Sequence, residues 1–294
     1  MMEYVRPEEL QNLASDSARQ RALDAKEHRE NFPVALRLLP AEHREALRAV
    51  YGFARTVDEL GDSYSGDRTA ALQTFTADID RIWAGHQPEH PVLQRLRPVV
   101  VGRNLEAEPF HLLIRANLQD QTVSRYPTFD DLLGYCRLSA DPVGRMVLGV
   151  FGVHDQETER LSDQVCTALQ LLEHWQDVAE DRRAGRIYLP QRDLATYDVV
   201  ESDLDAREAA PQVRALMSFE IERAAGLLEE GAAIVPRLDG WARVSVAGFV
   251  AGGRATVRAL RRTEGDVLSR QARPSKLGTA VGALRLLAHR QVAR

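Results

Sequence analysis

Apolar side chains recur at three- and four-residue steps along most of this 294-residue chain, and this is the spacing of one face of an α-helix. In residues 41–54, for example, Ala46, Leu47, Val50 and Tyr51 fall on one stripe. The sequence has no credible run of the two-residue alternation that marks a half-buried β-strand. The pattern therefore predicts an all-α protein.

Residues that cap or break helices divide this pattern into separate elements. Thr128 resembles an N-cap, Asp141-Pro142 should interrupt a helix because proline disfavours helical geometry in the residue before it, and Gly185 should end one. No Gly/Ser- or Pro-rich linker divides the chain, so we expect one domain over residues 1–294, with 1–27 as an N-terminal extension. The expected helices are residues 41–54, 69–83, 108–118, 132–137, 143–151, 162–181, 210–233, 241–263 and 277–292.

Composition excludes several classes of protein. The net charge of −5 gives no indication of a nucleic-acid partner. Cys136 and Cys166 lack the spacing of a zinc site, and His174 has no partner at ligand spacing, so we interpret it as a core-edge or surface histidine. The start of the chain lacks the apolar core of a signal peptide, and the nearly apolar residues 241–253 are too short for a membrane span. We therefore expect a cytoplasmic protein.

Two acidic clusters indicate a function. The first acidic cluster is Asp-Glu-Leu-Gly-Asp at residues 58–62, and the second is Asp-Val-Ala-Glu-Asp at residues 177–181. Each places two aspartates four residues apart, so both carboxylates project from one face of a helix. Mg²⁺ prefers oxygen ligands and bridges one or two carboxylates to phosphate groups. The two clusters together therefore indicate diphosphate chemistry.

The residues before each cluster extend the same helical faces. Arg55 and Tyr51 precede the first cluster by one and two turns, and Glu173 and Gln170 precede the second. Unpaired charge is costly to bury, so a stacked acidic face needs either water or a cation. Each cluster alone also fits a solvated surface, but their occurrence together favours a metal site.

These segments resemble the squalene/phytoene synthase family. The resemblance is carried by residues 51–62, by residues 169–190, and by Tyr135 with Val143 and Gly144. It implies an all-α, single-domain isoprenoid (terpenoid) synthase fold with helices around a central cavity. It also implies a prenyl diphosphate substrate held by two or three Mg²⁺ ions.

Within the family, residues 30–35, 139–144 and 174–177 are most similar to the hydroxysqualene synthases of the hopanoid pathway. That similarity implies a lyase, which ionises presqualene diphosphate, rearranges the cation and captures water to give hydroxysqualene. It implies no NADPH.

Three residues depart from the pattern of many relatives. Glu59 replaces an aspartate and keeps the charge, whereas Glu173 stands where many members have a metal-binding asparagine. Arg137 stands where condensing members carry a tyrosine that helps to form the cyclopropyl intermediate. Arg137 therefore favours an enzyme that starts from the cyclopropyl compound.

The resemblance assigns roles residue by residue. The catalytic residues it implies are Asp58, Asp62, Asp177, Asp181 and Gln170. The metal ligands it implies are Asp58, Glu59, Asp62, Glu173, Asp177, Glu180 and Asp181. The substrate-binding residues it implies are Asn31, Tyr51, Phe53, Arg55, Arg125, Tyr135, Arg137, Val143, Gly144, Gln176, Arg186 and Tyr188.

Two other functions remain open. One is a condensing prenyl transferase that makes presqualene diphosphate, squalene or phytoene from two prenyl diphosphates. The other is a non-catalytic helical subunit that binds prenyl lipids or a partner synthase. Other enzymes of the same pathway are further expected partners.

The C-terminal residues 276–294 form a basic amphipathic segment. Leu277, Val281 and Leu284 make an apolar stripe with Arg285 beside it. Such a helix either rests on the inner face of an anionic membrane or docks on the core with its arginines in water.

Overall fold

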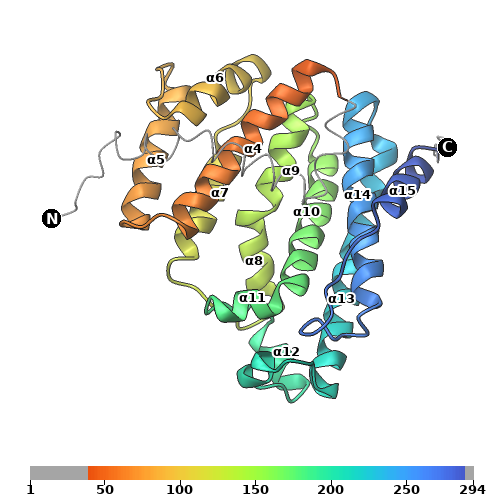
Figure 1. The fold of residues 1–294 in the computed structure, drawn as a ribbon. Helices are drawn as coiled ribbons and strands as arrows, with labels where there is room; N and C mark the ends of the chain where they lie inside the picture. The colour runs from red at the N-terminus through yellow and green to blue at the C-terminus, as the bar shows by residue number, and fades with distance from the viewer. Residues whose placement is uncertain (1–38, 289–294) are drawn as a thin grey trace. The chain divides into compact units, whose positions relative to one another are not determined.

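The computed structural model describes residues 39–288, and within them it is built of helices (Figure 1). The only β-type pairing among these residues is an isolated bridge between Arg125 and Ile187. The all-α prediction is confirmed. The α-helices are α4 (Ala41–Asp62), α5 (Arg68–Trp83), α6 (Pro91–Arg103), α7 (Glu108–Gln119), α8 (Phe129–Ser139), α9 (Asp141–Val150), α10 (Gln156–Gln176), α11 (Val178–Arg183), α12 (Gln191–Thr196), α13 (Pro211–Gly231), α14 (Gly240–Arg261) and α15 (Lys276–Ala288), and the 3₁₀ helices are η1 (Glu201–Asp205) and η2 (Ala232–Arg237).

The described residues fall into two compact units. The first contains α4 to α7 and residues 142–155, and the second contains residues 123–141 and the chain from residue 156 onward. Each unit holds one acidic cluster. The expectation of a single domain stays a prediction.

The first unit packs α5, α6 and α7 against α4. Its core contains three phenylalanines with no exposed surface: the ring centroid of Phe53 lies 5.9 Å from that of Phe75 and 5.0 Å from that of Phe110. These distances are those of interacting aromatic rings, and each buried ring removes a large apolar area from water. This core holds α4, whose last turn carries the first acidic cluster.

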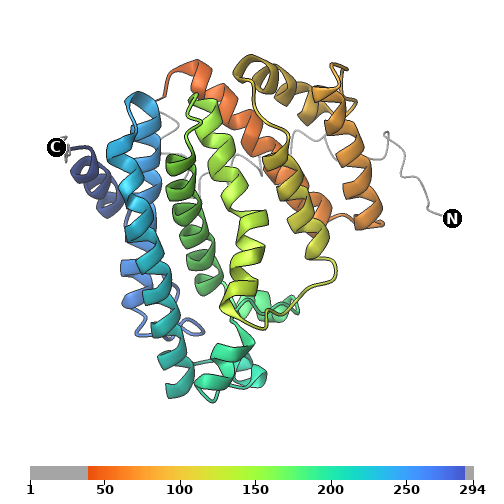
Figure 2. The ribbon, with the colours of Figure 1, turned by 180° about the vertical axis from the view of Figure 1, so that it is seen from behind.

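The second unit is centred on α10, which packs against α13 and α14. Figure 2 shows α13 in teal alongside α14 in blue. Trp175, near the end of α10, has no exposed surface, and its indole N–H donates to the backbone oxygen of Glu220 at 3.2 Å. This packing fixes the end of α10 just before the second acidic cluster begins.

The predicted helix boundaries are confirmed in part. Thr128 caps α8 in a capping box with Asp131, and Gly185 follows α11 with φ of +84°. The helix is interrupted at Ala140, between α8 and α9, so Asp141-Pro142 begins α9 directly after the interruption. The prediction of one helix over residues 162–181 is wrong. The helix starts at Gln156 and breaks at Asp177, whose φ and ψ are −106° and 14°.

Helices α6 and α12 were not predicted. The first contains Pro98, which masks its helical pattern because proline normally interrupts a helix, and the second is only six residues long. The extension 1–27, Asn31 and the end of the expected helix 277–292 lie outside the described residues.

Candidate active site

The first acidic cluster occupies the C-terminal end of α4. Asp58 and Glu59 are half-buried and Asp62 is exposed. The Asp58 Oδ1 accepts a hydrogen bond from the Asn117 Nδ2 at 3.4 Å, and the Arg55 Nε lies 3.5 Å from the Glu59 Oε1, one helical turn away. Arg55, Asp58, Glu59 and Asp62 are therefore brought together, as their spacing predicted.

Gly61 allows α7 to approach this cluster closely. A Cβ atom at Gly61 would lie 2.3 Å from the Asn117 Oδ1. The Gln121 Nε2 donates both to the Gly61 oxygen at 3.0 Å and to the Asn117 oxygen at 2.9 Å. Asn117 and Gln121 thus fasten the end of α4 to α7.

Asn117 and Gln121 are not among the predicted site residues. Asn117 is buried although it is polar, and buried polar groups are normally hydrogen-bonded. The available signal was two amide side chains four residues apart, one near the end of α7 and one just beyond it.

The second acidic cluster is built on the break between α10 and α11. The Asp177 backbone oxygen accepts from the backbone nitrogens of Glu180 and Asp181, both at 2.8 Å. Glu173, Asp177 and Glu180 are exposed, and Asp181 is half-buried. Partial loss of hydration raises the pKa of Asp177, and the negative charges of Asp181 and Glu180 raise it further.

The donor chemistry of these clusters fits Mg²⁺. Within residues 39–288, no group of three or more His, Cys, Asp or Glu side chains is gathered in metal-binding geometry. Mg²⁺ usually takes only one or two carboxylates and completes its shell with water and substrate phosphate. The repulsion that raises the pKa of Asp177 is the kind that a bound cation offsets. We conclude that each cluster suits a Mg²⁺ ion that arrives with a polyanion.

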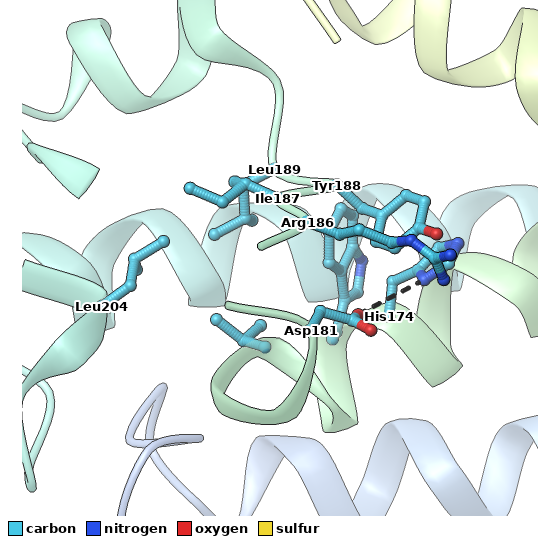
Figure 3. A pocket seen from close by; sticks show the side chains of 9 residues that line it. His174, Asp181, Arg186, Ile187, Tyr188, Leu189 and Leu204 are labelled. Carbon is cyan, nitrogen blue, oxygen red and sulfur yellow. Dashed lines mark ion pairs between the residues drawn. The ribbon is translucent and has the colours of Figure 1, made fainter. Parts of the chain in front are cut away.

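A small pocket lies beside the second cluster (Figure 3). The His174 ring stacks on the Tyr188 ring with their centroids 3.6 Å apart and their planes 16° from parallel. The His174 Nδ1 lies 3.7 Å from the Asp181 Oδ2, and its Nε2 lies 3.2 Å from the Gln170 Nε2. The pocket is lined by His174, Trp175, Val178, Asp181, Arg186, Ile187, Tyr188, Leu189 and Leu204.

Of the two expected positions for His174, at the edge of the core or at the surface, the structure shows a buried side chain, and its polar contacts were not predicted. Its side chain is buried and contacts Gln170, Asp181 and Tyr188. Burial lowers the pKa of His174, and the nearby Asp181 opposes this only in part. The spacing of His174 from Gln170 could have indicated one contact, but the contact with Asp181 depends on the break at residue 177.

Three tyrosines gather next to His174. The Tyr135 ring centroid lies 5.6 Å from that of Tyr188 and 5.4 Å from that of Tyr126, and all three rings are buried. Tyr135 and Tyr188 were predicted to bind substrate, and the fold brings them together. Tyr126 joins them, although it is not among the predicted substrate-binding residues.

Arg125 is held by several acceptors. Its Nε and Nη2 donate to the two carboxylate oxygens of Glu201 at 2.7 and 2.9 Å, and its Nη1 donates to the backbone oxygens of Ser124 and Gly185, both at 2.7 Å. A bidentate pair of this kind has a fixed geometry. Arg125 therefore links the segment before α8 to η1 and to the turn after α11.

The remaining predicted residues lie on several different helices. The Gln176 Nε2 donates to the Ala272 oxygen at 2.9 Å, and Arg137 is exposed on α8. Phe53 is enclosed in the core of the first unit. Tyr51 is half-buried on α4, and Val143 and Gly144 lie on α9.

Comparisons with known proteins agree with the resemblance. Residues 25–278 match the squalene/phytoene synthase family model. The chain is 33% identical over 208 residues to the hydroxysqualene synthase of Rhodopseudomonas palustris, covering 70% of each chain. It is also 33% identical over 215 residues to the 15-cis-phytoene synthase of Synechococcus elongatus, covering 68% of this chain and 70% of the relative.

Solved structures give the same fold. The squalene synthase HpnC from Alicyclobacillus acidocaldarius is 40% identical with a TM-score of 0.76, over 80% of this chain and 89% of that one. A dehydrosqualene synthase that is 24% identical has a TM-score of 0.82 over 96% and 98% of the two chains, and it supports the fold alone. The chain has the isoprenoid synthase fold, and it belongs to the squalene/phytoene synthase family.

Proposed function

We propose that this protein is a hydroxysqualene synthase that converts presqualene diphosphate and water into hydroxysqualene and diphosphate. The observation that carries the proposal is the pair of acidic clusters, each with the donor chemistry of a Mg²⁺–diphosphate site. The similarity to the hydroxysqualene synthase of Rhodopseudomonas palustris supports it. Arg137, which replaces the tyrosine implied for condensing relatives, favours a reaction that starts from the cyclopropyl diphosphate.

In this mechanism the carbon–oxygen bond to diphosphate breaks, and its electron pair leaves with the diphosphate. Mg²⁺ bound with the substrate would stabilise the charge that develops on this leaving group. The carboxylates come from two segments. Asp58, Glu59 and Asp62 belong to α4, whereas Glu173 belongs to α10, Asp177 to the break after it, and Glu180 and Asp181 to α11. Arg55, Arg125 and Arg186 are the donors proposed for the diphosphate oxygens.

The cation that remains must rearrange before water reaches it. Apolar and aromatic walls exclude water from such a cation, and Tyr135 and Tyr188 supply buried ring surface beside the second cluster. A water oxygen then bonds to the rearranged carbon and loses a proton, so no reductant is consumed. Gln170 is the polar side chain that we place near the reacting carbons.

The test is to incubate the purified protein with Mg²⁺ and presqualene diphosphate, with and without NADPH, and to identify the product by mass spectrometry. Hydroxysqualene in both reactions is expected, and it should disappear when the metal is chelated. Absence of hydroxysqualene from the wild-type reaction would contradict the proposal.

A condensing synthase is the second candidate, because the chain is equally similar to the 15-cis-phytoene synthase of Synechococcus elongatus. Incubation with farnesyl or geranylgeranyl diphosphate as the sole substrate separates the two reactions. Formation of presqualene diphosphate, squalene or phytoene would favour condensation. Prenyl-lipid binding without turnover, unaffected by a chelator, would favour a non-catalytic subunit.

We also propose that α15 contacts an anionic membrane surface. Its Gly282 side lies against Ala251 of α14, whereas Leu277, Val281 and Leu284 are 76%, 40% and 67% exposed. The helix sequence contains Lys276 and Arg285 and has no acidic residue. This combination is typical of a helix that lies in a membrane interface, and no helix among residues 39–288 has the length and apolarity needed to cross a bilayer.

Co-sedimentation with vesicles tests this contact. Wild-type protein should bind phosphatidylglycerol vesicles better than phosphatidylcholine vesicles, and Leu277→Ser with Leu284→Ser should weaken that binding. The matched control is Val101→Ser, which changes a 60% exposed apolar residue on α6. Equal binding by all three proteins would contradict a role for α15.

A further inference from the structure

His174 lies between two residues that the proposed function uses, and the reaction described above gives it no role. Its imidazole contacts Asp181 through Nδ1 and Gln170 through Nε2. We propose that His174 is a positioning residue, which holds its proton on Nδ1 and orients the Asp181 carboxylate and the Gln170 amide together. This inference rests on the proposed function, because that function makes Asp181 a metal ligand.

The ring is held in one orientation by its neighbours. Tyr188 stacks on it at 3.6 Å with nearly parallel planes, and Tyr135 lies 6.3 Å from it. Only 7% of His174 is exposed, so water cannot readily replace either polar contact. Each nitrogen of the ring therefore keeps its own partner.

The partners determine which nitrogen carries the proton. A carboxylate that ligates a metal accepts hydrogen bonds, so we assign the proton to the ring nitrogen that faces Asp181. The Nε2 is then an acceptor, and the Gln170 amide nitrogen, 3.2 Å away, donates to it. One neutral tautomer suits both contacts, because the bond made by one ring nitrogen sets the protonation of the other.

This arrangement links the metal ligand to the polar group placed near the reacting carbons. Partners that orient metal ligands limit ligand rotation, and their loss typically reduces metal affinity about 10- to 100-fold. The 3.7 Å between Nδ1 and Asp181 is longer than a direct hydrogen bond. Such contacts are often long before a substrate binds, so we expect this one to shorten when Mg²⁺ and diphosphate bind.

The first experiment reads the tautomer directly and requires no turnover. Protein labelled with ¹⁵N-histidine is examined by long-range ¹H–¹⁵N correlation, and the His174 signals are assigned by their loss in His174→Asn. We expect a neutral ring protonated on Nδ1 that responds to Mg²⁺ with inorganic diphosphate. A ring protonated on Nε2 would overturn the inference.

The second experiment measures Mg²⁺ binding in the presence of inorganic diphosphate by calorimetry. His174→Phe keeps the stacked ring but removes both nitrogens, so it should weaken Mg²⁺ binding about 10- to 100-fold. His174→Asn places an amide nitrogen near the Nδ1 position and should recover part of this loss. The control His154→Asn, at an exposed histidine, should bind as the wild type does.

The outcomes for the two proposals can be distinguished. Wild-type protein that binds Mg²⁺ and diphosphate with the expected tautomer, but never converts presqualene diphosphate, contradicts the proposed function and leaves the positioning role intact. Active wild-type protein whose His174→Phe variant binds Mg²⁺ equally well overturns the positioning role alone.

Discussion

At the scale of single residues, the close approach of α7 to α4 explains the residue at position 61 better than helical propensity does. Gly61 lies inside α4, where glycine is normally unfavourable by about 1 kcal/mol relative to alanine. The glycine is required because Asn117 of α7 occupies the space that a side chain would fill. One missing methyl group thus allows the hydrogen bond between Asn117 and Asp58.

Gly61→Ala should therefore destabilise the protein by about 1–3 kcal/mol, the usual range for overpacking, and lower activity by moving Asn117. The matched change is Gly52→Ala in the same helix, where the nearest atom to the new Cβ would be the Val92 Cγ1 at 3.9 Å. That control should be neutral or stabilising in urea unfolding. Similar effects of the two substitutions would show that the Asn117 contact is unimportant.

Glu220 makes stability depend on pH. It has no exposed surface, and burial raises the pKa of its carboxyl to about 8, although Arg223 opposes this. The folded state therefore keeps a proton that the unfolded state releases near the ordinary glutamate pKa of 4.5. Because the folded state binds more protons in this window, the contribution of Glu220 to stability falls as pH rises from about 4.5 to about 8.

Glu220→Gln should remove this pH dependence, since glutamine stays neutral. The difference in free energy of unfolding, Glu220→Gln minus wild type, should be at least about 1 kcal/mol larger at pH 8.5 than at pH 5. This is a lower bound, because a shift of one pKa unit already corresponds to about 1.4 kcal/mol. Urea unfolding at both pH values measures the difference. Glu222→Gln is the control: pairing with Arg261 lowers the pKa of Glu222 below its ordinary value, so its carboxyl is ionised in both states above pH 5 and the substitution should not change the pH dependence between pH 5 and pH 8.5.

At the scale of elements, breaks and links between helices place the functional side chains. Asp177 leaves helical geometry at the junction of α10 and α11, and this turns the Asp181 carboxylate toward His174. Arg125 joins the chain before α8 to η1 and to the turn at Gly185. Neither feature follows from helical periodicity. The periodicity indicates that a segment is helical and which face is buried, but it does not indicate where the helix breaks or which distant residue a side chain contacts.

Arg125→Lys should loosen the segment that contains Ile187, whose backbone nitrogen donates to the Ser124 oxygen at 3.0 Å. Lysine cannot form the bidentate pair with Glu201, so amide exchange in residues 184–190 should accelerate at least several-fold. Hydrogen-exchange mass spectrometry measures it. Arg160→Lys removes an equally bidentate pair, with Glu157 on the same helix, and exchange in residues 184–190 should be unchanged.

At the scale of the whole molecule, the proposed function requires carboxylates from both compact units. Asp58 belongs to the first unit and Asp177 to the second. A ligand that binds only the folded protein raises its unfolding temperature. Thermal stability with Mg²⁺ and inorganic diphosphate therefore reports whether each unit contributes to binding.

Wild-type protein should be stabilised by Mg²⁺ with diphosphate, whereas Asp58→Asn and Asp177→Asn should each lose most of this shift. Each substitution should also lower kcat/KM for the prenyl diphosphate by at least about 100-fold, the scale on which removal of one stabilising group acts. The control is Asp67→Asn, an exposed helix cap outside both clusters. A full shift in either cluster variant would contradict a role for that unit.

The sequence by itself determined the all-α class, the two acidic clusters, the cap at Thr128, the helix interruption next to Asp141-Pro142 and the family. These properties depend on neighbours within a few residues along the chain, where helical geometry is fixed. Only the tertiary structure decided that Asn117 contacts Asp58, 59 positions away, and that Arg125 pairs with Glu201, 76 positions away. It also decided that His174 faces Asp181. Such contacts depend on how helices pack and where they break, and local periodicity carries no information about which polar side chains then meet.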